Sequence, residues 1–357
     1  MNHPRVPSSE ERTSSVTTHT SLSDASSPEG LIRLGTAFCD AKILLSALEL
    51  DLFSTLAAKP RTLPELSDAL GLHPRGARDF VTALVTLGVL EADGELFRNS
   101  PAADRFLDRG KKSYAGGFLE RANSMLYPAW THLTDALRTG EPQVKGKDGD
   151  IVAQMADSRE HLDQFLTMMD SLNSQVAPKL AAAFDWASRT DFVDVGGARG
   201  NLSALLIDRH PHLTAQVFDL PHVAPAFDDH MKRLGTQDRI SFTGGDFFAD
   251  PMPSGQVLVM GHVLHNWSAE QRLGLIRKAY EAVEPGGALL VYDRMVDERP
   301  ADLVNLLISL DMLLVTHGGS EYSVEECRDW MTEAGFARTE AKVLSNTDSL
   351  VIGHKEG

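Results

Sequence analysis

The chain has 357 residues, which is too long for one ordinary core and suits two domains. Its composition, 42% hydrophobic and 24% charged, is typical of a soluble globular protein. The net charge of −16 argues against nucleic acid or an anionic membrane as the main partner. We therefore expect a small-molecule ligand.

The two cysteines, Cys39 and Cys327, lie far apart in the sequence, so neither a disulfide framework nor a Cys-x-x-Cys metal site is expected. No apolar run reaches the roughly 18 residues of a membrane span, and the N-terminus lacks the apolar core of a secretory signal. These features predict a cytoplasmic protein with no membrane partner.

Residues 1–28 are rich in serine and threonine and have almost no large apolar side chains, which predicts a disordered tail. From Leu31 to Ala58 apolar residues recur at helical spacing and leave little polar face. A helical segment this apolar needs a covering surface, so we expect a homodimer.

Residues 29–112 form the first predicted domain, and its second half has the pattern of a winged helix. A capping box at Thr62 starts one helix, Pro74 opens another, and Asp93–Gly94 marks a hairpin turn. A winged helix raises the alternative of a ligand-sensing transcription regulator. Acidic residues outnumber arginines six to four over 61–100, however, so the module offers little to bind phosphates.

Residues 113–186 are predicted as a helical linker region, interrupted by a polar loop at 138–150. Methionine and aromatic side chains, which can line a pocket for flat ligands, are frequent here. The alternative is that they form ordinary core. The candidate pocket residues in this region are Met125, Trp130, Phe165 and Met169.

Residues 187–357 alternate between strand and helix patterns, which predicts an α/β domain with a mostly parallel sheet covered on both faces. The last two strands, joined through Asn346, are expected to be antiparallel. The five earlier strands are expected at 191–196, 214–220, 239–248, 256–261 and 287–296.

Three acidic residues lie at the ends of successive predicted strands. Asp194 precedes a glycine cluster that includes Gly196 and Gly197, and Asp219 ends the next strand, where a carboxylate can bind the hydroxyls of a ribose. Asp246 can accept from an adenine amino group. Each acid alone could be a solvated loop residue or a helix cap, but together they indicate a nucleoside site.

The glycine cluster lacks the G-x-G-x-x-G spacing of a dinucleotide site, and a carboxylate beside it repels phosphate. An adenosine that carries an ammonium and a sulfonium instead of phosphate suits it better. We therefore favour S-adenosylmethionine as the cofactor.

His265 follows the fourth predicted strand and precedes a capping box formed by Ser268 and Gln271. It therefore lies in a strand-to-helix loop, at the end of a parallel sheet where ligands bind. A lone loop histidine is more often structural. His262 and His317 are weaker candidates for a catalytic role.

Taken together, these motifs resemble the S-adenosylmethionine-dependent O-methyltransferases of the caffeate and hydroxyindole type, including bacterial enzymes that finish aromatic natural products. The resemblance runs from about Leu31 to the C-terminus and rests on "VDVGGARG", "FDLP", "GDFF", "HVLHNW", "EPGGALLVYD" and "GGSEYSVEECRDWMTEAGF" in that order. It implies a winged-helix-like dimerisation domain followed by a class I Rossmann-like methyltransferase domain.

By this resemblance His265 is the general base, and Asp293 and Glu321 flank and orient it. An imidazole with a pKa near neutrality suits deprotonation of a phenol, whose pKa is about 10. Leu220 and Phe247 join the cofactor residues, and Met169 and Met312 border the substrate cavity.

The resemblance implies methylation of a phenolic or similar hydroxyl on a small aromatic metabolite. The alternatives are methyl transfer to nitrogen or carbon, or non-methylating chemistry with the same cofactor. No ligand cluster at metal spacing is apparent in the sequence, so no metal is expected. Four residues depart from the family pattern: Ala198 for glycine, Asn266 for aspartate, Asp293 for glutamate and Tyr322 for arginine.

Overall fold

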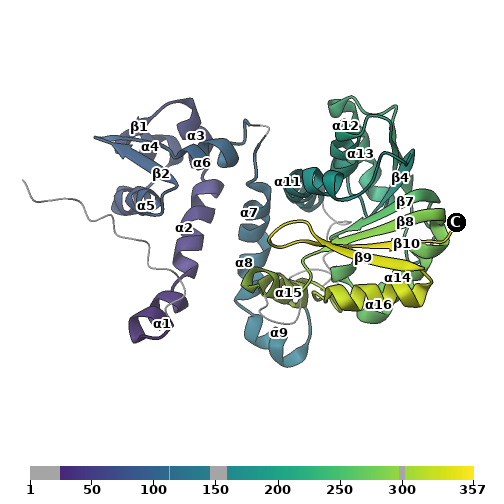
Figure 1. The fold of residues 1–357 in the computed structure, drawn as a ribbon. Coiled ribbons are helices and arrows are strands. Elements are labelled where there is room, and N and C mark those ends of the chain that lie inside the picture. The colour runs from purple at the N-terminus through teal and green to yellow at the C-terminus, as the bar shows by residue number, and fades with distance from the viewer. Residues whose placement is uncertain (1–24, 112, 145–158, 297–301) are drawn as a thin grey trace, which may run out of the picture.

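The structure is a computed structural model that describes residues 25–111, 113–144, 159–296 and 302–357 (Figure 1). Residues 1–24 of the predicted tail and 145–150 of the predicted polar loop lie outside the described residues. Figure 1 shows an N-terminal helical part beside a larger part built on a sheet, with α7 and α8 between them.

The N-terminal part holds a small three-stranded antiparallel sheet, in the order β1-β3-β2, packed among short helices. The capping box at Thr62, the proline start at Pro74 and the hairpin turn at Gly94 are all confirmed. The helix, turn, helix and hairpin come in the expected order, while the assignment as a winged helix stays a prediction. The elements are α1 (Pro28–Gly35), α2 (Phe38–Glu49), α3 (Leu52–Ala58), β1 (Arg61–Thr62), α4 (Leu63–Leu70), α5 (Pro74–Thr86), β2 (Leu90–Asp93), β3 (Leu96–Asn99) and α6 (Pro101–Leu107).

The apolar segment 31–58 is helical, as its pattern predicts, and is divided among three helices. The chain turns between α2 and α3 at Asp51, whose φ of 55° is left-handed and incompatible with a continuing α-helix. The turn lets Leu52 and Phe53 reach the core of the small sheet. Tertiary burial therefore overrides the helical periodicity at this point.

The middle region is helical, as predicted, and includes one π-helical turn. Gly117 packs so closely against α11 that an added Cβ would lie 2.9 Å from the Thr167 carbonyl oxygen. The region thus forms a wall in which α7 rests on α11. The elements are α7 (Gly117–Arg121), the π-helical η1 (Ala122–Leu126), α8 (Tyr127–Trp130), α9 (Leu133–Thr139) and α11 (Arg159–Ala183).

The C-terminal part contains a seven-stranded sheet in the order β6-β5-β4-β7-β8-β10-β9, which confirms the predicted α/β class. β4, β5, β6, β7 and β8 are parallel, and the last two strands join antiparallel at one edge, as predicted. The strands are β4 (Asp191–Val195), β5 (Thr214–Asp219), β6 (Ile240–Gly244), β7 (Gly255–Gly261), β8 (Val283–Asp293), β9 (Arg338–Val343) and β10 (Ser349–His354).

Helices cover both faces of this sheet, because the buried strands carry apolar side chains on both sides. On β8, Leu290 packs into the cluster with α11, α12 and α13, whereas Leu289 and Val291 pack into the cluster with α14 and α16. The helical segments are α12 (Asn201–Arg209), η3 (Pro221–Val223), α13 (Ala224–Leu234), η4 (Leu264–Asn266), α14 (Ala269–Ala282), α15 (Leu303–Val315) and α16 (Val324–Ala334).

Two predicted strand boundaries differ from the structure by four residues. β8 begins at Val283, before the predicted Gly287, because its first residues pair with the start of β7 around an irregularity near Gly255. β6 ends at Gly244, so Asp246 and Phe247 lie in the following loop. None of the helices in the described ranges combines the length and apolar character that crossing a bilayer needs.

Candidate active site

A cavity of about 420 Å³ lies where the parallel strands end at their carboxyl edge. The loops after β4, β5, β6 and β7 form one side, and α7, η1, α11 and α15 supply the other. Asp219, Asp246 and His265, which are far apart in the sequence, all line this one cavity. We call the strand-loop side the cofactor wall and the helical side the substrate wall.

Asp219 is fixed on the cofactor wall by backbone donors. One carboxylate oxygen accepts from the amide of Ala198 at 2.7 Å, and the other accepts from the amide of Leu220 at 2.7 Å. Burial raises the pKa of Asp219, while these two hydrogen bonds oppose that rise. The carboxylate keeps lone pairs free for further donors, such as the two hydroxyls of a ribose.

The glycine loop leaves room beside Asp219. Gly196 has a φ of 70°, and an added Cβ there would lie 2.7 Å from a methyl of Val263. Ala198, which replaces the family glycine, adopts a left-handed φ of 52° and lines the cavity. The loop therefore turns at Ala198, which combines a small side chain with a left-handed backbone.

Asp246 and Phe247 line the same wall one loop further on. An oxygen of Asp246 accepts from the amide of Phe248 at 2.9 Å, which orients the carboxylate. Two acids at neighbouring strand ends beside an aromatic ring can accept from the hydroxyls and the amino group of an adenosine, so this wall fits the nucleoside half of S-adenosylmethionine.

Two predicted cofactor residues do not reach the cavity surface. Asp194 is buried beneath the loop, accepts from the Ser203 hydroxyl at 2.8 Å, and has a pKa raised to about 7 by burial. Gly197 lies directly above it, since an added Cβ would be 2.6 Å from the Asp194 carboxyl carbon. Their contact with the cofactor stays a prediction.

His265 is positioned by the loop between β7 and α14. The capping box of Ser268 and Gln271 starts α14, as predicted, and the buried Arg272 on that helix donates to the Leu264 carbonyl at 3.0 Å. Asn266 donates to the His262 carbonyl at 3.1 Å, so this departure from the family pattern stabilises the turn. The loop holding His265 is thus anchored on both sides.

The predicted catalytic residues come together. Nδ1 of His265 lies 2.8 Å from Oε1 of Glu321 in a hydrogen bond and 3.8 Å from Oδ1 of Asp293. Tyr322, another departure from the family, donates its hydroxyl to Oδ2 of Asp293 at 2.5 Å. Since Glu321 occupies Nδ1, the other ring nitrogen, Nε2, remains for a substrate.

The electrostatics of His265 differ from the expectation of a near-neutral pKa. Burial lowers the pKa of the ring, but the charges of Asp293 and Glu321 outweigh burial and raise it to about 9. The imidazolium is therefore favoured at neutral pH. Burial in turn raises the pKa of Asp293, and the charge of His265 opposes this.

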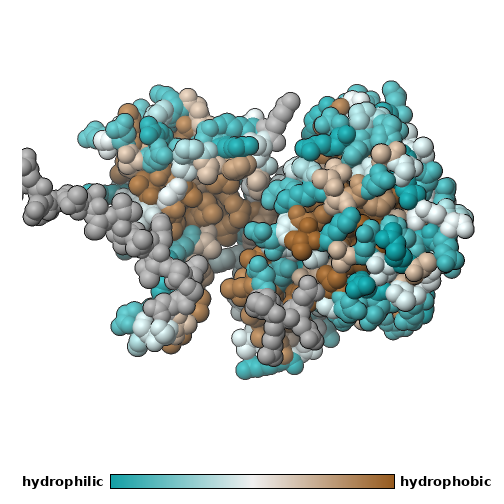
Figure 2. Space-filling model, in the orientation of Figure 1, coloured by the Kyte–Doolittle hydropathy of each residue, from teal (hydrophilic) through white to brown (hydrophobic). Residues whose placement is uncertain are grey.

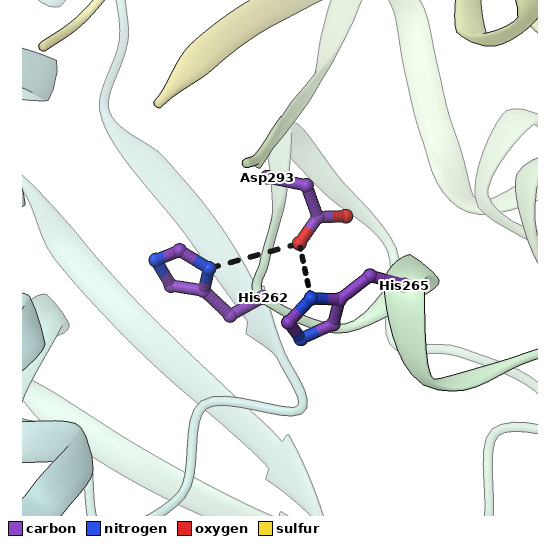
Figure 3. Close-up of side chains that lie close together, drawn as sticks. All are labelled: His262, His265 and Asp293. Carbon is purple, nitrogen blue, oxygen red and sulfur yellow. Dashed lines mark ion pairs between the residues drawn. The ribbon is translucent and has the colours of Figure 1, made fainter. Parts of the chain in front are cut away.

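His262, ranked low from the sequence, also lines the cavity. Figure 3 shows it beside His265, with both rings near Asp293. Its Nδ1 lies 3.7 Å from Oδ1 of Asp293, and its Nε2 lies 3.4 Å from Oδ1 of Asp348. His262, His265 and Asp293 thereby place three possible metal-ligand atoms within 4.8 Å of one another, a cluster that the sequence spacing does not reveal. His262 and His265 follow β7 and Asp293 ends β8, so the pairing of these two strands in the sheet brings the three residues together.

The substrate wall contains most of the predicted pocket residues. Met125, Phe165, Met169 and Met312 line the cavity. Trp130 is not among the lining residues. Its indole nitrogen donates to Asp311, and Asp311 does line the cavity. The pKa of Asp311 is raised to about 6 by burial.

Sequence reasoning missed two charged residues of this wall, Arg121 and Asp311, and two at the catalytic end, Arg294 and Asp348. Arg121 directly follows Glu120 in the sequence, so no local signal distinguishes it from an ordinary surface arginine. His262 is already among the weaker candidates that the sequence offers, and it lies three residues before His265 on the same loop.

Comparison with known proteins points to the same family that the sequence motifs resemble. An O-methyltransferase domain matches residues 130–337, and an O-methyltransferase dimerisation domain matches residues 32–109. The tetracenomycin polyketide synthesis 8-O-methyl transferase TcmO of Streptomyces glaucescens is 49% identical over 92% of this chain and 97% of its own length. The N,N-dimethyltransferase OxyT of Streptomyces rimosus is 39% identical over 95% of this chain and 99% of its own.

Among solved structures, human N-acetylserotonin methyltransferase in complex with S-adenosylmethionine superposes with a TM-score of 0.85 at 25% identity. The match covers 92% of this chain and 97% of the human one. Together with the cavity and its acids, these likenesses show that the chain belongs to the O-methyltransferase family and is an S-adenosylmethionine-dependent O-methyltransferase.

Proposed function

We propose that His265 is the general base that deprotonates a phenolic hydroxyl of an aromatic, polyketide-type acceptor. The observation that supports this most is the shared cavity. The acids that suit a nucleoside, Asp219 and Asp246, and the imidazole of His265 line one continuous space. A hydroxyl held near His265 can therefore lose its proton beside the bound cofactor.

The roles of the residues follow from their contacts. When bound, S-adenosylmethionine supplies an electrophilic methyl on a sulfonium. Nε2 of His265 accepts the hydroxyl proton, while Glu321 holds Nδ1 and with it the ring orientation. Asp293 and Glu321 stabilise the imidazolium that forms, and Tyr322 keeps Asp293 in place. A positioned base of this kind contributes about 10²- to 10⁴-fold.

The proposed acceptor is a flat polycyclic molecule. Methionine and aromatic side chains of the substrate wall adapt to such a surface, and the cavity volume of about 420 Å³ exceeds the lower range of small-molecule sites, roughly 300 Å³. The name of the 49% identical relative refers to a polyketide hydroxyl. The 39% identical relative is named for transfer to nitrogen, so the acceptor atom needs a direct test.

The test is product analysis with a methyl-labelled cofactor and a panel of hydroxylated polycyclic aromatics, with matched aminoaromatics as controls. We expect the label on oxygen, located by mass spectrometry and NMR. Label found on nitrogen or carbon alone would contradict the proposed acceptor. A spent cofactor without labelled product would indicate non-methylating chemistry.

We also propose that the chain forms a homodimer through its N-terminal helices. Leu31, Ile32, Leu34 and Phe38 are each at least half exposed in the single chain, and Figure 2 shows apolar surface on the N-terminal part. The match to a dimerisation domain over 32–109 supports this assembly. Sedimentation should give twice the chain mass of 38.9 kDa, and a monomer at working concentration would contradict it.

The division of labour that we propose is a dimerisation domain at 29–112, a pocket-lining helical region at 113–186 and a cofactor domain at 187–357. Phe165 and Met169 on the cavity wall support the middle assignment. We further propose that turnover needs no metal, since Nδ1 of His265 is already bound to Glu321. Turnover should survive treatment with a chelator, and its loss, restored by a divalent ion, would overturn this.

A further inference from the structure

One charged side chain of the substrate wall has no function in the mechanism above. Arg121 ends α7, is only 3% exposed, and lines the cavity among Phe118, Met125 and Met168. Because α7 rests directly on α11 at Gly117, the arginine is held within the wall and does not project to the outer surface. The π-helical turn η1, a feature that often occurs at functional sites, begins at the next residue.

The guanidinium of Arg121 is buried without compensation. Its Nε and Nη2 atoms are fully covered and have no hydrogen-bond partner, and no carboxylate within the described ranges lies at ion-pair distance. Burial lowers the pKa of Arg121 to about 10, and the side chain therefore still carries its charge at neutral pH. Buried charges are normally paired, because an unpaired one loses its hydration without replacement.

Arg272 provides an internal comparison, since it is also only 3% exposed. Its guanidinium donates to the Leu264 carbonyl and to both oxygens of Ser320, and it stacks 4.7 Å from the ring centre of Tyr322. This fold thus satisfies a buried arginine where the role is structural. Arg121 lines the cavity without such partners, and of its three guanidinium nitrogens only Nη1 is not among the fully covered atoms.

We propose that Arg121 binds a planar anionic oxygen group, of which a carboxylate is the simplest, on the aromatic acceptor. Nη1 can donate to a carboxylate oxygen in a charge-assisted hydrogen bond, and the surrounding methionine and phenylalanine side chains exclude water from the pair. The inference rests on the proposed methylation of an aromatic acceptor in this cavity. It adds that the acceptor carries an acidic substituent away from the hydroxyl that reacts.

The test compares two probes that differ only in the carboxylate, 3-hydroxy-1-naphthoate and 2-naphthol. Their affinities for the protein saturated with S-adenosylhomocysteine are measured by calorimetry. We expect the wild type to bind the naphthoate about 10- to 100-fold more tightly, as a charge-assisted hydrogen bond in a dry pocket predicts. Equal affinities, or no carboxylate-dependent binding in the wild type, would overturn the proposal without any variant.

Arg121→Met keeps an unbranched, flexible side chain in the wall and removes the charge. We expect it to abolish the preference for the naphthoate, to leave 2-naphthol binding unchanged and to raise the melting temperature of the ligand-free protein. Arg121→Lys should keep part of the preference, and Arg138→Met, at an exposed position on α9, should change nothing. A preference that survives in Arg121→Met would contradict the assignment.

An acid from a second copy of the chain is the competing partner for Arg121. In that case Arg121→Met would lower the melting temperature or dissociate the dimer, and the wild type would show no naphthoate preference, which overturns the proposal. Because binding is measured without turnover, the outcome is separate from the proposed function. A naphthoate preference without any methylated product would leave this inference intact and contradict the proposed O-methylation of such acceptors.

Discussion

The cofactor wall and the substrate wall of the same cavity are built in different ways. The cofactor wall consists of loops that leave neighbouring strands of one sheet, and backbone amides fix its acids, as at Asp219. The substrate wall comes from the contiguous α7 and η1, from α11 and from α15, three regions that are distant in sequence and meet only through packing. Its charged groups, Arg121 and Asp311, are few and lie among apolar side chains, although Asp311 accepts from the indole nitrogen of Trp130.

This difference separates cofactor binding, which we expect to be constant, from acceptor binding, which we expect to vary. Hydrogen bonds from the main chain do not depend on side-chain identity, so the cofactor wall tolerates sequence change around its acids. The substrate wall depends on every side chain that fills it, so small changes there alter which acceptor fits. His265 lies where the two walls meet, and its buried acidic partners belong to neither.

The largest effect is expected where the walls meet. His265→Gln removes the base but keeps a similar shape, so turnover should fall about 10²- to 10⁴-fold. Binding of S-adenosylhomocysteine, measured by calorimetry, should remain unchanged because the cofactor wall is untouched. His132→Gln at an exposed position is the matched control. Full turnover in His265→Gln would disprove the base assignment.

A change confined to the cofactor wall should weaken cofactor binding, which His265→Gln is expected to leave unchanged. Asp219→Asn keeps the size of the side chain but loses the charge that the buried site holds, so S-adenosylhomocysteine should bind about 10- to 100-fold more weakly. Asp228→Asn, exposed on α13, serves as the control. Unaltered affinity in Asp219→Asn would show that this wall does not bind the nucleoside.

The pH dependence of the rate tests the acids behind His265. The base works deprotonated, so its raised pKa of about 9 places the onset of kcat/KM on the alkaline side. Glu321→Gln removes one negative charge, and the onset should move to lower pH by roughly 1–3 units, with a lower maximum rate. Glu325→Gln, an exposed neighbour on α16, should leave the profile in place. An onset that moved upward would contradict the electrostatic assignment.

The smallest effect concerns the scaffold that both walls share. Ser268→Ala removes the cap of α14, which should cost about 1 kcal/mol. Calorimetric melting should then occur about 2–4 °C lower, as expected for a domain of this size. Ser174→Ala, at an exposed helical position on α11, is the control with little expected change. A melting point unchanged by Ser268→Ala would show that the loop is held by Arg272 and not by the cap.

The two walls also differ in how far the sequence predicts them. Asp219 and Asp246 could be assigned because each follows a recognisable strand, and parallel strands end at the same edge. Met125 and Phe165 could be proposed only because their region is rich in methionine and aromatic side chains that suit a pocket. Trp130, proposed on the same ground, contacts Asp311 instead of lining the cavity. The break of the 31–58 segment at Asp51 was likewise invisible, since burial of Leu52 and Phe53 decides it.

The sequence by itself determined the alternation of strands and helices, the order of the strand-end acids and the place of His265 in a strand-to-helix loop. These depend on local periodicity and on capping residues close together in the chain. Only the tertiary structure decided the raised pKa of His265, the cluster with His262 and the solitary charge of Arg121. Each of these depends on burial and on distances between residues far apart in the chain, which no local pattern contains.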